Sequence, residues 1–99
     1  MRPTTEGDAC VVAVTGELDA QTAPELTTTA SAGLDAPDTH QLVLDLSEVT
    51  FIDSTGIAAL VRLRRRTLDA GKRLLLRNPG VRVVKVLEIT ALNSIFDIE

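Results

Sequence analysis

Three short apolar runs, separated by segments with helical spacing, limit the folds that this chain can adopt. The runs cover residues 11–14, 42–46 and 74–76, and they are built almost entirely from Val and Leu. Runs of this length and composition are typical of buried strands. Strands that alternate with helices pair in parallel through right-handed crossovers. The sequence therefore predicts an α/β fold with a single small sheet, mostly parallel, and helices packed on it.

The first helix is expected between the first two of these strands. Thr22 and Glu25 have the spacing of a capping box, and Pro24 is tolerated in a first helical turn because that position needs no donor. A helix should therefore begin near Thr22, and Gly33 is its expected terminator. The polar loop that follows contains His40, which we expect at the surface because no metal-ligand partners are spaced around it.

Two more helices and a last strand are expected further along the chain. The segment after Ser54 has an apolar face and should end at Gly71, and Pro79 suits the first position of a third helix. Arg64 falls within the apolar face, so its methylenes should pack while its guanidinium extends to water. The near-continuous apolar run at 42–46 predicts a central strand covered on both faces. The expected apolar positions are Ile57, Leu60, Val61 and Leu68, then Val83, Val84, Val86 and Leu87, and finally Ile95, Phe96 and Ile98 in the strand.

The composition fits one soluble domain and argues against several functions. The chain has 99 residues, of which 44% are hydrophobic and 24% are charged. Its two aromatic residues, Phe51 and Phe96, provide no platform for stacking bases, so direct nucleic-acid binding is not expected. Cys10, the only cysteine, lies in an apolar run and should be a buried structural thiol. Because no stretch resembles a signal peptide or a membrane span, we expect a cytoplasmic protein without a membrane partner.

Charge is distributed unevenly along the chain. Residues 1–60 hold ten acids and one base, a net charge of −9, whereas residues 61–99 hold four acids and nine bases, a net charge of +5. A partner that docks on the acidic part should therefore present Arg or Lys. The basic cluster at residues 62–66 is expected to form a solvated helix face rather than a ligand site.

The turn that contains Asp53 and Ser54 is the strongest candidate for function. It follows an apolar strand and lies where a helix should begin. The start of a helix has N–H groups without partners and a positive partial charge, so a hydroxyl there can accept a phosphate. Asp and Ser are also common helix caps in proteins of any function. Local sequence alone leaves both interpretations open.

The residues needed for catalysis are missing around this serine. A serine nucleophile needs a base within hydrogen-bonding reach, and His40 is the only histidine. The hydrolase elbow has Gly two residues before the serine, where this chain has Ile52. Residues 71–73 form only a fragment of a phosphate-loop pattern, and no metal-ligand spacing is present. We therefore expect a binding module with no catalytic residues and no metal, whose state is changed by another enzyme.

Several segments together resemble a known family. They are Thr15-Gly16-Glu17-Leu18-Asp19, the strand at 42–46, Phe51-Ile52-Asp53-Ser54-Thr55-Gly56-Ile57 and Lys72-Arg73-Leu74. In this order and at these separations, they resemble the STAS domain, in particular the bacterial anti-sigma factor antagonists. The resemblance covers nearly the whole chain, and it implies a single STAS domain over residues 1–99 with a STAS-like sheet.

The resemblance also implies a switch and its partners. In that family the serine at the position of Ser54 is phosphorylated by the anti-sigma factor, which is itself a serine kinase that uses ATP and magnesium. A metal-dependent serine phosphatase reverses the modification. The unphosphorylated protein binds the anti-sigma factor and releases the sigma factor. Because ATP and magnesium belong to the partner kinase, this chain is expected to need no cofactor.

The same resemblance indicates which residues contact the partner. We expect contacts at Asp53, Ser54, Thr55 and Gly56, with Ser54 as the phosphate acceptor, and at Asp19 near the same edge. Asp19 can equally be a helix cap. Gly56 either lets the partner's active-site loop approach the hydroxyl, which we favour, or allows close helix packing.

The chain departs from the family pattern in three places. Relatives commonly have a strand before Gly7 and a helix after the last strand, so both ends look short and the C-terminal helix is expected to be lacking. An apolar patch left exposed there would favour self-association or indicate a shortened sequence. Ala91 stands where relatives often have Gly before the last strand.

One other function shares these motifs. A STAS subunit can regulate a transporter or a sensory complex without any sigma-factor circuit. The sequence motifs do not separate this alternative from an anti-sigma factor antagonist.

Overall fold

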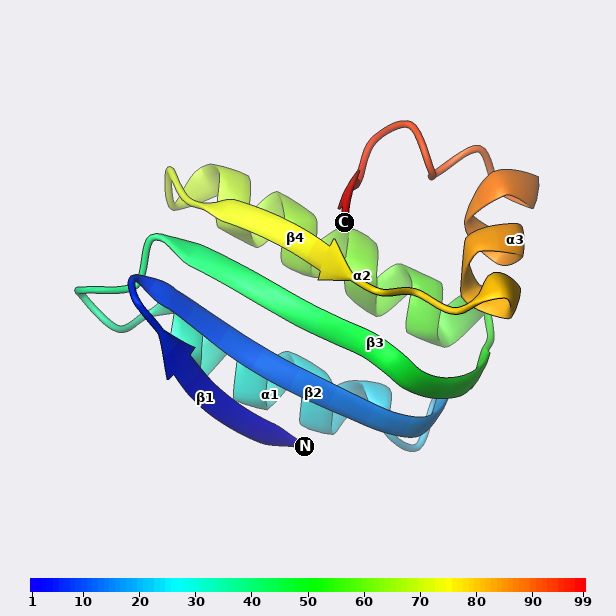
Figure 1. Cartoon of the computed structure of the whole chain (residues 1–99), viewed down its shortest axis with the longest axis horizontal. Coiled ribbons are helices and arrows are strands. Elements are labelled where there is room, and N and C mark those ends of the chain that lie inside the picture. The colour runs from blue at the N-terminus through cyan, green and yellow to red at the C-terminus, as the bar shows by residue number, and fades with distance from the viewer.

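The computed structural model describes residues 1–99 as one sheet of five strands with three helices (Figure 1). The strands lie in the order β1-β2-β3-β4-β5, and all neighbours are parallel except β1 and β2. This confirms the expected mostly parallel α/β sheet. The elements are β1 (Arg2–Glu6), β2 (Ala9–Leu18), α1 (Ala23–Leu34), β3 (Gln41–Ile52), α2 (Ser54–Asp69), β4 (Arg73–Arg77), α3 (Val81–Ile89) and β5 (Asp97–Ile98).

The central strand β3 is longer than its apolar run and determines where the helices begin. It pairs with β2 along its whole length, so that Leu18 and Ile52 are opposite each other at the ends of the two strands. Its pairing with β4 stops at Asp45 opposite Arg77, and α3 packs beside the second half of β3 instead. The ends of β2 and β3 and the helix α3 therefore gather at one end of the molecule (Figure 1).

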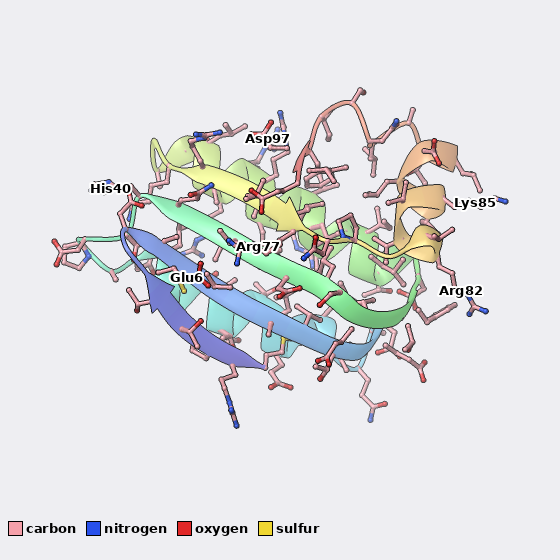
Figure 2. The ribbon with its side chains drawn as sticks, viewed as in Figure 1. Glu6, His40, Arg77, Arg82, Lys85 and Asp97 are labelled. Atoms are coloured by element: carbon pink, nitrogen blue, oxygen red, sulfur yellow. The ribbon has the colours of Figure 1, made fainter.

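Helices α1 and α2 cover one face of the sheet, and this face holds most of the core (Figure 1). The other face has no helix, so the expectation that the central strand is covered on both sides was wrong. On this face Val43 is nevertheless only 1% exposed, because Ala9, Val11 and Leu75 of the neighbouring strands pack beside it. Figure 2 shows Arg77 and Glu6 pointing toward one another over the same face.

Arg77 forms two ion pairs on this open face. Its guanidinium lies 3.4 Å from a carboxylate oxygen of Glu6 and 3.4 Å from one of Glu99. The hydrogen bond with Glu6 raises the pKa of Arg77 above its ordinary value, so the guanidinium stays protonated. Because β1 and β4 lie on either side of β2 and β3, the contact with Glu6 spans the middle of the sheet.

The first helix begins close to the expected residue, but not through a capping box. Thr22 is the N-cap of α1, yet its hydroxyl donates to the carbonyl of Glu17 at 2.7 Å instead of capping the helix. Glu25 pairs with the terminal amine of Met1 at 2.8 Å. The capping-box interpretation was therefore wrong, because both side chains find partners outside the helix.

Gly33 lies inside the last turn of α1 and does not terminate it. A side-chain carbon at this position would collide with the sulfur of Cys10, which is buried as expected. Gly33 is therefore a packing residue, and burial raises the pKa of the Cys10 thiol. Lys72 closes this end of the helix, because its amine donates to the carbonyls of Leu34 and Ala36.

Helix α2 buries Ile57 and Leu60 as expected, but the rest of its buried face differs from the expected one. Leu63 and Thr67 are buried, whereas Val61 is 37% exposed and Leu68 is 56% exposed. Arg64 is half-buried, and its Nε donates to the carbonyl of Ile95 at 2.9 Å. The Arg64 guanidinium therefore fixes the segment before β5 as well as reaching toward water.

The remaining elements agree with expectation apart from their boundaries. Helix α3 begins at Val81 with Gly80 as its N-cap, so Pro79 precedes the helix. Val83 and Leu87 are buried on its inner face. The last strand has only two residues, and Arg2–Glu6 forms the first strand, so the start of the chain is not short of this element.

Gly56→Ala should destabilise the fold. A side-chain carbon at Gly56 would collide with the carbonyl oxygen of Leu18 and lie 2.9 Å from Cγ1 of Ile52. Because backbone cannot swing away as a side chain can, we expect the free energy of unfolding to fall by about 1–3 kcal/mol in urea denaturation. Gly80→Ala is the control, since nothing lies within 4 Å of its added carbon. Equal stability of the Gly56 variant and the unchanged protein would contradict this packing.

Ala91→Gly should stabilise the fold. Ala91 has a φ of +59°, a left-handed conformation that costs a residue with a side chain about 1–2 kcal/mol. Glycine removes that strain but adds about 0.4–1 kcal/mol of unfolded-state entropy. We expect a net gain of about 0.5–1 kcal/mol in the free energy of unfolding. Ala70→Gly, at a residue with φ of −85°, should lose stability in the same measurement.

Candidate functional site

The candidate site lies where two neighbouring parallel strands end side by side. Leu18 at the end of β2 is opposite Ile52 at the end of β3, and an aspartate follows each strand. The backbone N–H of Asp53 donates to the carbonyl of Leu18 at 3.2 Å. This bond joins the turn before α2 to the end of β2. The parallel register therefore places Asp19 and Asp53 at the same edge of the sheet.

Asp53 caps helix α2. Its backbone is extended, and its Oδ1 accepts a hydrogen bond from the N–H of Gly56 at 3.0 Å. Its carbonyl accepts from the N–H of Ile57 at 2.9 Å. The cap interpretation of this turn is confirmed for Asp53. The first N–H groups of a helix have no acceptor within the helix. The Asp53 side chain accepts a hydrogen bond from only one of them, the N–H of Gly56.

Ser54 is the first residue of α2, and its side chain is exposed. None of the hydrogen bonds of the structure uses its hydroxyl. Thr55, the next residue, is half-buried. The cap and the exposed hydroxyl are thus on different residues, so a cap at this turn does not exclude a phosphate acceptor.

Asp19 forms the turn that leads into α1. Its Oδ1 accepts hydrogen bonds from the N–H groups of Gln21 at 3.0 Å and Thr22 at 3.2 Å. The capping role that the sequence left open for Asp19 is confirmed. Its other oxygen, Oδ2, has no partner within the protein, so a contact of Asp19 with a second protein stays a prediction.

Gly56 is buried beneath the first turn of α2. It packs against the backbone of Leu18 so closely that no side chain fits. Close helix packing is therefore confirmed, and it is the interpretation that we did not favour from the sequence. We leave Gly56 out of the candidate contact surface, because the buried residue offers little to a partner.

Thr22 has a structural role that its spacing from Glu25 did not predict. Its hydroxyl accepts from the N–H of Asp19 at 3.0 Å and donates to the carbonyl of Glu17, which fixes the turn that positions the Asp19 carboxylate. The signal was present in the spacing of Asp19 and Thr22, which is that of an Asx-type turn before a helix.

The carboxylates of Asp19 and Asp53 form an acidic rim beside Ser54. Neither is in an ion pair, because the side-chain ion pairs of the chain join Arg66 to Asp35 and Arg77 to Glu6 and Glu99. The negative charge of the rim is therefore not neutralised from within the protein. An approaching surface with Arg or Lys would be attracted to it.

The other chemically reactive side chains lie away from this site. His40 is exposed just before the start of β3, whereas Ser54 follows the end of the same strand of 12 residues. This separation excludes His40 as a base for the Ser54 hydroxyl. No group of three or more His, Cys, Asp or Glu side chains could hold a metal ion. None of the helices has the length and apolar character needed to cross a bilayer.

Comparison with known proteins gives consistent matches over nearly the whole chain. The family model described as "Mlab, STAS domain" matches residues 1–97. The chain is similar to the anti-sigma-B factor antagonist of Bacillus subtilis, with 32% identity over 91 residues, which cover 88% of this chain and 78% of that protein.

Solved structures show the same fold. An anti-sigma factor antagonist from Mycobacterium paratuberculosis superposes with a TM-score of 0.81 at 28% identity, covering 98% of this chain and 81% of that one. The Bacillus protein SpoIIAA superposes in its phosphorylated form with a TM-score of 0.75 at 18% identity, covering 99% of this chain and 89% of that one. Its unphosphorylated form gives a TM-score of 0.81 at 19% identity, covering 99% of this chain and 86% of that one. From the match of residues 1–97 and the identity to the Bacillus subtilis protein, the chain belongs to the STAS domain family.

Proposed function

We propose that this protein is an anti-sigma factor antagonist that is switched by phosphorylation of Ser54. In its unphosphorylated state it binds an anti-sigma factor, and the sigma factor is released. The anti-sigma factor is a serine kinase, which transfers the terminal phosphoryl group of ATP to the Ser54 hydroxyl. A serine phosphatase hydrolyses that phosphate and restores binding.

The exposed hydroxyl of Ser54 at the first position of α2 is the observation that carries this proposal. A kinase must reach the hydroxyl oxygen without unfolding its substrate, and no side chain of this protein holds that oxygen. The relatives support the same function, because proteins named anti-sigma-B factor antagonist match 87% or more of this chain.

The helix start explains why a phosphate need not disturb the fold. A phosphoserine carries about −1.5 to −2 charges at neutral pH and has three strong acceptor oxygens. At the first position of α2 these oxygens lie near N–H groups that have no helical acceptor and near the positive end of the helix dipole. The match to SpoIIAA in both its phosphorylated and unphosphorylated forms is consistent with a fold that tolerates the modification.

The added charge acts on docking instead. It would be placed beside Asp53, in a rim that already lacks a neutralising base. The basic side chains of the partner pair with Asp19 and Asp53 around the serine, whereas a phosphate on Ser54 itself would be covered by the docked surface. There the phosphate would lose its hydration or meet acidic groups of the partner. A penalty of roughly 3 kcal/mol, within the several expected for like charges, weakens binding about a hundredfold.

In this proposal the chain has no catalytic activity of its own. The nucleotide and its magnesium ion are held by the kinase, and Ser54 is the acceptor of the phosphoryl group. Asp19 and Asp53 attract the basic surface of the kinase, and Thr55 lies at the edge of the contact. The protein therefore works as a docking surface whose charge is set by two other enzymes.

The alternative function is regulation of a transporter or a sensory complex. The two functions can be distinguished by identifying the proteins that copurify with the chain from its native cells. A small ATP-binding kinase supports the antagonist function. A transport ATPase or a large sensor assembly supports the alternative. We favour the antagonist because relatives with 32% identity carry that name.

Ser54→Ala should bind the anti-sigma factor but never be released by phosphorylation. The substitution removes the acceptor oxygen and leaves the acidic rim and the Asp53 cap in place. Incubation with the kinase and labelled ATP, followed by mass spectrometry, should show no phosphate on this variant and one phosphate on the unchanged protein. Thr55→Ala is the matched control and should be labelled normally. Labelling of any residue other than Ser54 would show that the site is wrong.

Ser54→Asp should weaken binding without unfolding the protein. A carboxylate adds one charge where the phosphate adds nearly two, so we expect a loss of affinity of about tenfold, half of the phosphate effect in free energy. Calorimetric titration with the anti-sigma factor measures this loss, and urea denaturation checks that stability is kept. Unchanged affinity together with unchanged stability would contradict the charge mechanism.

A further inference from the structure

An apolar groove lies between the end of β3 and helix α3, a few residues before Ser54. Its volume is about 340 Å³, within the range of pockets that hold ligand groups. We call it the α3 groove. It is lined by Phe51, Ile52, Arg82, Lys85, Val86 and Ile89.

The groove exists because β4 ends early. The pairing of β3 with β4 stops at Asp45, and α3 lies beside the remaining part of β3 in place of a strand. The helix buries Val83 and Leu87 against the core but leaves Ile89 at 76% exposure, and Phe51 is 47% exposed across the groove. Large apolar side chains that face each other across a groove mark a contact site for another molecule.

The groove also carries positive charge. Arg82 and Lys85 line it from α3, and Figure 2 shows both side chains pointing away from the body of the molecule. Neither forms an ion pair with any residue of the chain. The one acid of α3, Glu88, does not line the groove. The groove is therefore complementary to a segment with acidic and apolar side chains.

We propose that the α3 groove receives an acidic segment of the same partner that docks at Ser54. Apolar side chains of that segment insert between Phe51 and Ile89, and its carboxylates pair with Arg82 and Lys85. This inference deepens the proposed function, since it concerns how the same partner is held. The acidic rim and the basic groove give one end of the molecule two signs of charge, so only one orientation of the partner satisfies both.

A second copy of this chain fits the groove less well than a partner does. The C-terminal stretch 95–99 combines exposed apolar and acidic residues, but it is already in use. Ile98 lies in β5, and the N–H of Glu99 donates to the carbonyl of Leu76 at 2.9 Å. The Glu99 carboxylate pairs with Arg77. Among the other exposed apolar residues of the helices, Val61 and Leu68 lie on α2, whose exposed face is basic, and Val81 lies beside Arg82 at the start of α3.

The groove can be tested with a defined probe that needs no knowledge of the partner. The probe is a synthetic amphipathic peptide with leucines on one face and glutamates on the other, titrated into the full isotope-labelled chain by NMR. We expect saturable shifts at the groove residues and at least a tenfold loss of affinity in the Arg82→Glu/Lys85→Glu double variant. Phe51→Ser should also weaken binding, because it removes one apolar wall.

Matched controls separate a groove from general charge attraction. The Arg62→Glu/Arg65→Glu double variant makes the same change of charge on the exposed face of α2 and should bind the peptide as the unchanged protein does. A peptide with lysines in place of the glutamates should not bind. Equal binding of both peptides, an equal loss in both double variants, or no binding to the unchanged protein would overturn the proposal.

Two further measurements keep the inference separate from the phosphorylation switch. Ser54→Ala should bind the peptide normally, so a failure of Ser54 labelling would overturn the switch and leave the groove standing. Analytical ultracentrifugation tests for a second copy as occupant. A dimer that the Arg82→Glu/Lys85→Glu substitutions dissociate would overturn the choice of a partner segment, and a monomer in both cases supports it.

Discussion

The parallel register of β2 and β3 is the constraint on which the site depends. Because Leu18 and Ile52 end their strands at the same level, the carbonyl of Leu18 can accept the N–H of Asp53 and lie against Gly56. These contacts fix the start of α2 without using any side chain of the acidic rim. The Asp53 cap then completes the first turn. Ser54 stays exposed at that point, because Asp53 and Gly56 make the structural contacts of the turn.

The structural contacts and the exposed hydroxyl are on different residues of the turn. This explains how a small domain can be switched by a change of surface charge rather than by a change of shape. The buried side of the turn holds the fold together through backbone contacts, and these do not involve the serine hydroxyl. The exposed side has a free hydroxyl, two carboxylates and no neutralising base. A dianion added there makes the charge of the surface more negative. The core behind it, which includes Leu18 and Leu60, keeps its packing.

Local patterns in the sequence predicted the strands β2, β3 and β4, the mostly parallel sheet and the helix that begins at Ser54, because apolar runs and cap residues act over a few positions. The first strand, Arg2–Glu6, has no apolar run and was not predicted. Features that depend on distant neighbours were not predictable in this way. Thr22 bonds to Glu17 instead of capping α1, and Gly33 makes room for Cys10 instead of ending that helix. The buried face of α2 depends on how the helix packs against α1 and the sheet. The α3 groove depends on the early end of β4, which no local pattern indicates.

The central claim is that a phosphate on Ser54 changes the charge of the surface and leaves the fold in place. It is tested most directly by comparing amide NMR spectra and hydrogen exchange of the full chain with and without phosphate on Ser54. The account predicts shifts confined to the start of α2 and the ends of β2 and β3, with exchange protection in the core unchanged. Shifts spread through α1, β4 and the middle of the sheet, or a general loss of protection, would contradict it.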